Sequence, residues 1–420
     1  MMNIGYACLT LGVTNADFKS CLQKNATDEK LVELITHNLN SLETVIDYNI
    51  RNQIKLFRIS SDLIPFASSP VNKLPWWDLF ETQFDRIGRK LKTGKVRVSM
   101  HPGQYTVLNS PDKAVVERAM EDLVYHERVL DALGTNSESK IILHIGGVYG
   151  DKEKAVQRFE ENYEQLDPLV KRRLVIENDD RSYTITDAFE LGSKLSIPVV
   201  FDNLHHRINP CEGPTDDAYW MEEAGKTWAD RDGRQKIHYS QQDPEKRQGS
   251  HSGTISTDEF LGFYHKVRTM DIDIMLEVKD KNLSAVKCRN LISERRDIKD
   301  LELEWSRYKY AVLEHSPNGY NEIRKLLRDK AEYPATAFYR LLEETLATER
   351  EIGKSINAAQ HIWGYFRDSA TEQEKLSFLK CVEEFRLGRS DGNKMKRSLW
   401  KLTEKYRESY LINSYYFILD

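Results

Sequence analysis

The sequence has 420 residues, of which 40% are hydrophobic and 30% charged, and no apolar run approaches the roughly 18 residues of a membrane span. Its formal net charge of -5 excludes a global basic field, so contact with a nucleic acid requires a local basic surface. The five cysteines are scattered and form no CxxC pair, which argues against a disulfide framework or a zinc ribbon. The opening stretch MMNIGYACLT lacks the basic and apolar regions of a secretory signal, so we expect a soluble, cytoplasmic protein without a membrane partner.

From residue 3 to about residue 278 the chain repeats a short apolar or β-branched run followed by a longer segment with helical spacing. We expect eight strands, over residues 3–9, 54–61, 95–102, 140–147, 173–180, 197–203, 235–241 and 272–280. Strands that alternate with helices favour a parallel sheet, and eight repeats favour its closure into a (β/α)8 TIM barrel. An open doubly wound sheet is the alternative. No G-x-G-x-x-G follows the first strand, so we expect no nucleotide cofactor.

After about residue 300 the sequence has helical spacing throughout, which predicts an all-α C-terminal domain. The stretch SERRDIKDLELE at 293–304 is highly charged and lacks a wide apolar stripe, so we interpret it as a linker. These patterns predict a barrel domain over residues 1–295 and a helical domain over residues 296–420.

Six consecutive predicted strands, the third to the eighth, each end on an imidazole or a carboxylate. In chain order these residues are His101, His144, Glu177, Asp202, His238 and Glu277. Each alone has an ordinary explanation, such as a hydrogen-bonded histidine, a helix cap or a surface ion pair. The carboxyl ends of all strands meet at one mouth of a barrel, however, and burying so many ionisable groups there without a metal is costly. Imidazole and carboxylate ligands suit Mn, Zn or Fe, so the pattern predicts a metal cluster.

Lys236 lies two residues before His238 and is therefore expected on the same face of the strand. An ammonium group directed at divalent ions would repel them. Either Lys236 contacts a substrate phosphate, or its nitrogen carries a carboxylate, or the register is shifted by one residue and the side chain faces outward.

Carboxylates shared between two metal ions suit phosphodiester hydrolysis, since one ion activates water and another stabilises the leaving oxygen. The same residue types serve single-metal isomerases and epimerases of sugars on this fold. The number of candidate ligands exceeds a four-ligand set, which favours a multi-metal hydrolase; the excess is notably His101, His144, His205 and His251.

Eight motifs in the first 290 or so residues resemble those of the ultraviolet-damage endonuclease family. They are GYACL from Gly5, FRISSDLIPFAS from Phe57, MHPGQYTVLNSP from Met100, HIGGVYGDK from His144, IENDDRSYT from Ile176, VFDNLHH from Val200, KIHYS from Lys236 and LEVKDK from Leu276. The resemblance implies a metal-dependent nick immediately 5′ to an ultraviolet photoproduct in double-stranded DNA, leaving a 3′-hydroxyl and a 5′-phosphate. It also implies two or three divalent ions, with manganese the usual suggestion.

The same resemblance implies roles for individual residues. The metal set is His101, His144, Glu177, Asp202, His205, His238, His251 and Glu277. Lys236 is the lysine to be carboxylated, and we expect it to be catalytic together with Glu177 and Glu277. Gln104 and Tyr105 resemble a probe that enters the duplex at the lesion, and Tyr6 resembles a residue that lines the pocket for the displaced bases.

Two positions depart from the family pattern. Ser69 replaces a histidine, so a third metal position is weakened, absent or filled by water; Thr10 replaces an asparagine near Tyr6. A non-catalytic damage-binding protein, in which Ser69 marks decay of the metal site, therefore stays a third hypothesis.

The last 120 or so residues resemble a helical family of unknown function, the YbgA-like proteins. His361, Trp363 and Tyr365 form an aromatic stripe at helical spacing, which is either core or a binding face. Six cationic residues form a candidate DNA-binding patch or a solvated helix face: Lys394, Lys396, Arg397, Lys401, Lys405 and Arg407. The sequence leaves the oligomeric state open.

Overall fold

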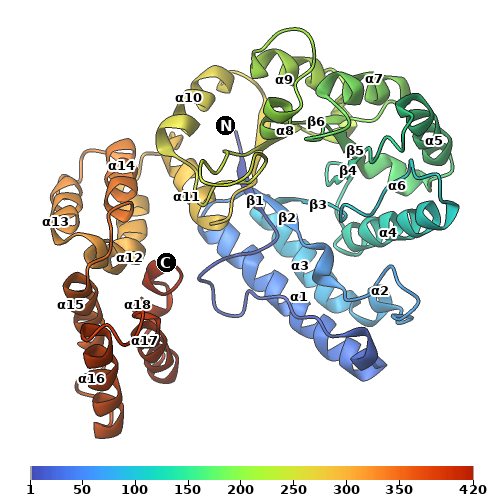
Figure 1. Ribbon diagram of the computed structural model, residues 1–420. Coiled ribbons are helices and arrows are strands. Elements are labelled where there is room, and N and C mark those ends of the chain that lie inside the picture. The colour runs from blue at the N-terminus through green and yellow to red at the C-terminus, as the bar shows by residue number, and fades with distance from the viewer. Residues whose placement is uncertain (1, 420) are drawn as a thin grey trace. The chain divides into compact units, whose positions relative to one another are not determined.

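A computed structural model describes residues 2–419, and within them eight parallel strands form a closed barrel (Figure 1). The strands pair in chain order, and the last pairs with the first. They are β1 (Ile4–Ala7), β2 (Leu56–Ile59), β3 (Arg97–Met100), β4 (Ile141–His144), β5 (Leu174–Glu177), β6 (Val199–Asp202), β7 (Gln235–Tyr239) and β8 (Ile272–Leu276). The predicted (β/α)8 barrel is confirmed. Each strand is shorter than the residue range over which it was predicted.

Helices connect the strands and surround the barrel. They are α1 (Asp28–Arg51), α2 (Trp76–Leu79), α3 (Glu81–Gly94), α4 (Lys113–Ala132), α5 (Lys152–Glu164), α6 (Pro168–Arg173), α7 (Ile185–Leu195), α8 (Asn203–Ile208), α9 (Asp217–Gly225), α10 (Thr257–Val267) and α11 (Asn282–Leu291). Polar side chains in the preceding loops cap the N-termini of several of these helices. At α7, Thr184 accepts a hydrogen bond from the backbone N–H of Asp187, whose carboxylate accepts one from the backbone N–H of Thr184.

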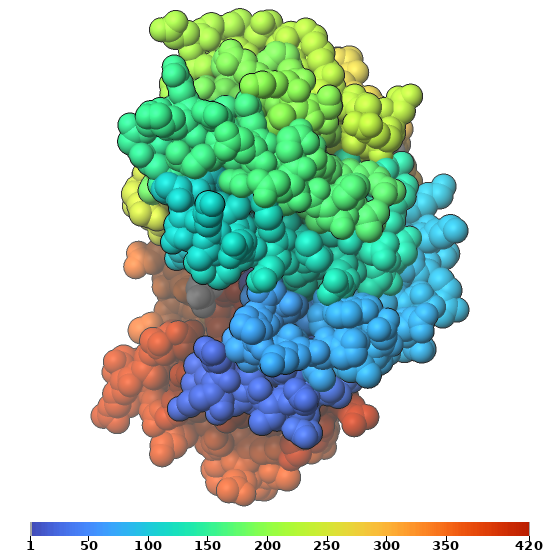
Figure 2. All heavy atoms as spheres, turned by 90° about the vertical axis from the view of Figure 1, so that its right-hand side faces the viewer, coloured from blue at the N-terminus to red at the C-terminus, as the bar shows by residue number. Residues whose placement is uncertain are grey.

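The barrel strands are buried on both faces because helices cover them outside and side chains fill them inside. Leu174–Glu177 and Ile272–Leu276 are buried at every position. Gly5 is required where β1 meets β2, since a Cβ there would lie 2.3 Å from the carbonyl oxygen of Leu56. In Figure 2 the helices and loops coloured light blue to green form a continuous outer surface over one side of this unit. Polar side chains of the barrel can therefore reach solvent mainly at the ends of the strands.

The C-terminal part is helical, as predicted. Its helices are α12 (Ile298–His315), α13 (Pro317–Leu326), α14 (Ala335–Leu346), α15 (Ile352–Trp363), α16 (Glu372–Arg386), α17 (Asn393–Tyr406) and α18 (Ser409–Ile412). The linker interpretation of 293–304 is wrong from Ile298 onwards. Helix α12 begins there and buries Leu301 and Glu304, because Glu304 pairs with Arg307 one turn later at 2.7 Å.

Of the aromatic stripe on and after α15, Trp363 is partly buried within the helical part, whereas His361 and Tyr365 are exposed. Trp363 stacks on Phe378 with ring centroids 4.7 Å apart, and the Tyr310 hydroxyl donates to that of Tyr365 at 2.9 Å. Trp363 thus contributes to the core of these helices.

Three of the six cationic residues near the C-terminus are engaged in ion pairs inside the same part. Lys394 pairs with Glu384 at 2.6 Å, Lys405 with Glu374 at 2.6 Å, and Lys396 with Glu314 at 2.8 Å. These pairs neutralise much of the positive charge, which favours the solvated-face interpretation over a DNA-binding patch.

The described chain divides into two compact units. One contains residues up to 10 together with 15–289, and the other contains 11–14 together with residues from 290 onwards. The domain boundary between 295 and 296 stays a prediction. Within the described residues, no helix is both long enough and apolar enough to cross a membrane.

Candidate functional site

Six predicted site residues lie at the carboxyl ends of consecutive strands. His144, Glu177 and Asp202 are the last residues of β4, β5 and β6, and His238 is the fourth residue of β7. His101 and Glu277 directly follow β3 and β8. Strand register sets His144 beside Glu177 and Asp202 beside His238. The structure therefore brings these side chains together, while their role as ligands stays a prediction.

Glu177 lies at the centre of the group. His238 donates from Nδ1 to Oε1 of Glu177 at 2.6 Å. His101 Nε2 and His144 Nε2 lie 3.3 and 3.8 Å from Oε2, and His205 Nδ1 lies 3.9 Å from Oε1. One fully buried carboxylate thus contacts or approaches four imidazoles from four strand ends.

Glu277 forms a second centre beside the first. His238 Nδ1 lies 3.4 Å from Oε1 of Glu277, and His251 Nε2 lies 3.8 Å from Oε2. Arg58 forms an ion pair with the same carboxylate through Nη1. The sequence predictions missed Arg58. The available signal was an arginine flanked by Phe57 and Ile59 in a predicted strand, but only the fold brings this arginine to Glu277.

Backbone carbonyls orient two of the histidines. His205 donates from Nδ1 to the carbonyl oxygen of Asn178 at 2.9 Å, and His101 from Nδ1 to that of Pro102 at 3.0 Å. Such hydrogen bonds fix the ring and leave Nε2 for a cation, as they do in many metal centres.

Asp202 combines a local role with its place in the site. Its Oδ1 accepts a hydrogen bond from the backbone N–H of His205 at 2.8 Å and so caps the short helix α8. This cap places His205 one turn from Asp202, with its Nδ1 3.8 Å from Oδ1. The motif VFDNLHH therefore supplies two site residues through one helix start.

Burial and the charges of the site shift the pKa values of several of its side chains. Burial favours the neutral form of Glu177, but His238 and the close approach of His101 hold the pKa of that carboxyl well below its ordinary value. Burial also opposes protonation of His205, yet the Asp202, Glu177 and Glu277 carboxylates raise its pKa to about 9. Burial raises the pKa of Asp202. The protein thus holds several acidic groups in a buried space where nearby positive charge stabilises their ionised forms.

The residues fit a divalent cation. Oδ2 of Asp202 and Nε2 of His238 are buried, and neither has a hydrogen-bond partner among residues 2–419. Two overlapping groups could each hold an ion, His101 with His144 and Glu177, and Glu177 with Asp202 and His238. Buried polar atoms are seldom left unpaired, and mixed imidazole and carboxylate sets suit Mn, Fe or Zn. The arrangement is consistent with binding of divalent metal.

Lys236 is fully buried in β7, and its Nζ finds no hydrogen-bond partner in the described chain. Burial and the nearby charges of Arg97, Arg58 and Lys140 lower the pKa of its ammonium group, opposed by Asp273. The environment is therefore unfavourable to a protonated lysine.

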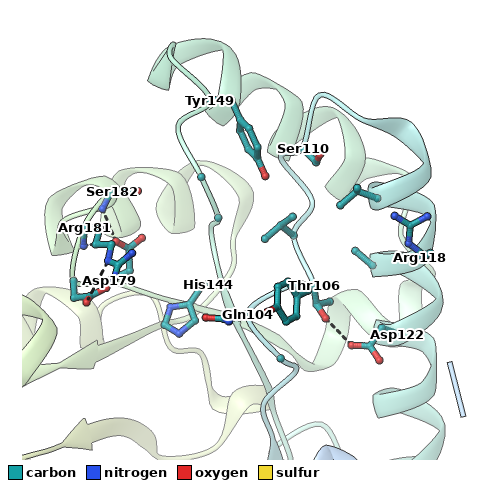
Figure 3. Close-up of a pocket in the computed structure, with 18 of the residues that line it drawn as sticks. Gln104, Thr106, Ser110, Arg118, Asp122, His144, Tyr149, Asp179, Arg181 and Ser182 are labelled. Carbon is teal, nitrogen blue, oxygen red and sulfur yellow. Dashed lines mark hydrogen bonds and ion pairs between the residues drawn. The ribbon is translucent and has the colours of Figure 1, made fainter. Parts of the chain in front are cut away.

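Gln104 and Tyr105 lie on the loop after β3, beside a cleft of about 1070 Å³ that His144 and His205 also line (Figure 3). The side chain of Tyr105 is 83% exposed. The base of this loop is anchored, because Thr106 donates from its backbone N–H to Gly103 at 2.9 Å and from its hydroxyl to Asp122 at 2.7 Å. An aromatic ring is thus presented to solvent on a supported loop at the mouth of the barrel.

Tyr6 does not join this group. It is fully buried, and its hydroxyl hydrogen-bonds to Thr10 at 2.7 Å and to Asn49 at 2.8 Å. Its predicted place in a pocket for displaced bases finds no exposed surface and stays a prediction. Ser69 lies in neither candidate metal group of the described residues, and its hydroxyl accepts from the backbone N–H of Val71 at 3.4 Å.

Comparison with known proteins assigns the chain to a family. The chain matches the family described as "UV-endonuclease UvdE" over residues 2–308, and the family described as "Protein of unknown function (DUF1722)" over residues 309–419. A UV DNA damage endonuclease of Clostridium perfringens (strain 13 / Type A) is 38% identical over 412 residues, which cover 96% of each chain. That relative therefore spans both parts.

Two further proteins match this chain over about 70% of its length. A UV DNA damage endonuclease of Bacillus cereus (strain G9842) is 34% identical over 298 residues, covering 70% of this chain and 93% of the relative. The crystal structure of SacUVDE matches with a TM-score of 0.66 and 35% identity, covering 72% of this chain and 99% of that chain. The resemblance inferred from the sequence motifs is confirmed, and the chain belongs to the UV-endonuclease UvdE family.

Proposed function

We propose that this protein is a metal-dependent endonuclease of DNA repair that nicks the backbone immediately 5′ to ultraviolet photoproducts. The observation that carries the proposal is the clustering of five imidazoles with the carboxylates of Glu177, Glu277 and Asp202, in a chain of the UvdE family. The substrate is double-stranded DNA that contains a photoproduct, and the products are a 3′-hydroxyl and a 5′-phosphate.

Two or three divalent ions, with manganese the leading candidate, would be held by His101, His144, Glu177, Asp202, His205, His238, His251 and Glu277. Bound there, they would lower the pKa of an attacking water and stabilise the charge on the leaving oxygen. The chain's own contribution is to hold these ligands in place through strand register, the helix cap of Asp202 and the carbonyl contacts of His101 and His205.

Gln104 and Tyr105 would contact the DNA at the lesion. Photoproducts stack and pair poorly, so their removal from the duplex costs less than that of sound bases. An exposed ring at the barrel mouth can occupy the vacated space and replace the lost stacking. Selectivity would then come from deformability of the duplex and not from its sequence.

The first test is incision of an ultraviolet-irradiated duplex by the purified protein. We expect nicking with Mn²⁺, complete loss after chelation, and recovery when Mn²⁺ is returned. Metal analysis of the same preparation should find two or three ions per chain. One ion would favour a single-metal sugar isomerase or epimerase, and DNA binding without metal or incision would favour a non-catalytic damage-binding protein.

We further propose that Lys236 is carboxylated. The neutral amine would attack carbon dioxide to form a carbamate with release of one proton, and the resulting anion suits the charges of Arg97, Arg58 and Lys140. Protein equilibrated with isotopically labelled bicarbonate should show a carbamate carbon resonance by NMR. Lys236→Met should lack it, and a wild-type spectrum without the resonance would contradict the modification.

A further inference from the structure

A second aromatic side chain, Tyr149, faces the cleft that Gln104 and Tyr105 line. It lies between β4 and α5, and its side chain is 47% exposed. In Figure 3 the ring of Tyr149 extends from its loop into the space on the far side of the cleft from Gln104 and His144. The cleft therefore presents aromatic rings from two successive loops of the barrel mouth.

The backbone at Tyr149 is strained. Its φ of +50° lies in the left-handed region, which bulky side chains rarely adopt and which favours glycine. Outliers of this kind persist where the surrounding structure enforces them, and they concentrate at functional sites. Exposure of a large ring at a strained position is a combination that stability alone does not favour.

The loop of Tyr149 is tied to the loop of Tyr105. Asn109, five residues after Gln104, donates from Nδ2 to the carbonyl oxygen of Gly147 at 2.8 Å. Gly146 has a φ of +113°, and a Cβ there would lie 2.3 Å from Oδ1 of Asn109. A hydrogen bond and a close packing contact thus link the loop of Tyr149 to the segment that follows Tyr105.

Arg158 of α5 supports the ring. Its guanidinium lies 5.6 Å from the centroid of the Tyr149 ring, and its Nε donates to the carbonyl oxygen of Asn109 at 2.8 Å. A cation beside the ring attracts it electrostatically and adds positive charge near the cleft.

We propose that Tyr149 is a second DNA-contacting residue, whose ring stacks on an unpaired base of the damaged duplex beside the nucleotides that meet Gln104 and Tyr105. The inference rests on the proposed function, since it is the DNA in the cleft that supplies the base. Stacking on a base that has left the duplex needs an accessible ring, and the ring of Tyr149 is 47% exposed beside the cleft.

The test uses the full-length protein and three variants. Tyr149→Gly removes the ring and suits the left-handed backbone, so we expect a melting temperature no lower than that of wild type. Tyr149→Phe keeps the ring. Leu169→Ala is the surface control, because Leu169 is 45% exposed and lies on α6 just before β5, at the opposite end of the barrel.

Affinity for an irradiated duplex, measured by fluorescence anisotropy with a chelator to prevent incision, should fall about 5- to 150-fold in Tyr149→Gly. Tyr149→Phe and Leu169→Ala should stay within about twofold of wild type, since neither loses a ring in the cleft. Unchanged affinity in Tyr149→Gly, or an equal loss in Tyr149→Phe, would overturn only this inference. Failure of wild type to prefer irradiated over intact duplex would overturn it together with the proposed function.

Discussion

The Glu177→Gln variant should nick irradiated DNA at least about 1000-fold more slowly than wild type, because metal ions contribute several kcal/mol of charge stabilisation. Glutamine preserves the shape of the side chain but removes the negative charge that four imidazoles approach. If the amide nitrogen of this glutamine faced Nδ1 of His238, two hydrogen-bond donors would meet and the hydrogen bond between these residues would be lost. Incision rates at saturating Mn²⁺ and the metal content of the purified variant measure both effects.

The matched control is Glu127→Gln, the same substitution at another buried glutamate. Glu127 lies on α4 and pairs with Arg173, which directly precedes β5 at the end of the barrel away from the site. We expect this variant to lose some stability and to retain metal content and the incision rate of its folded fraction. A Glu177→Gln variant that keeps its metal and nicks within about tenfold of wild type would contradict the central role of this carboxylate.

The Tyr105→Ala variant should lose preference for damaged over intact duplex by about 5- to 150-fold, the range expected when stacking on one base is removed. The ring is 83% exposed and contributes little to the folded core, so the thermal unfolding temperature should not change. Competition binding between irradiated and intact duplexes measures the preference.

Tyr105→Phe separates stacking from hydrogen bonding by the hydroxyl and should behave as wild type. Metal content should be equal in all three proteins, because Tyr105 belongs to neither of the metal-binding groups found in residues 2–419. If Tyr105→Ala discriminates damage as well as wild type, the ring does not replace the stacking of the lesion.

The barrel was predictable because its signals are local. Most strand residues are apolar and buried, and the helices have their own periodicity, several of them with capping side chains, so eight repeats imply closure without any knowledge of contacts. The position of the candidate ligands followed from the same pattern, since parallel strands bring their carboxyl ends to one mouth.

The linker interpretation failed for a physical reason that the sequence does not display. Charged residues around Leu301 and Glu304 suggested a solvated segment, yet Glu304 is buried in α12 because Arg307 neutralises it there. Whether a charged run is solvated or paired depends on partners that helix formation and packing supply.

The residues that escaped prediction depend on contacts between distant parts of the chain. Arg58 is separated from Glu277 by 219 residues and meets it only because β2 and β8 both flank β1. Tyr149 is a loop tyrosine in the sequence and becomes notable through its backbone strain, the tie from Asn109 and its place beside the cleft.

By itself, the sequence determined the fold class, the strand ends that carry imidazoles and carboxylates, and, through its motifs, membership of the UvdE family. Tertiary structure decided that Glu177 and Glu277 are the centres of the site, that Arg58 balances one of them, and that Tyr6 is buried. It also decided that Nζ of Lys236 has no hydrogen-bond partner among residues 2–419. The division has one cause: periodicity and capping act between residues close in the chain, whereas desolvation and charge pairing depend on which distant side chains the closed barrel brings within a few ångströms.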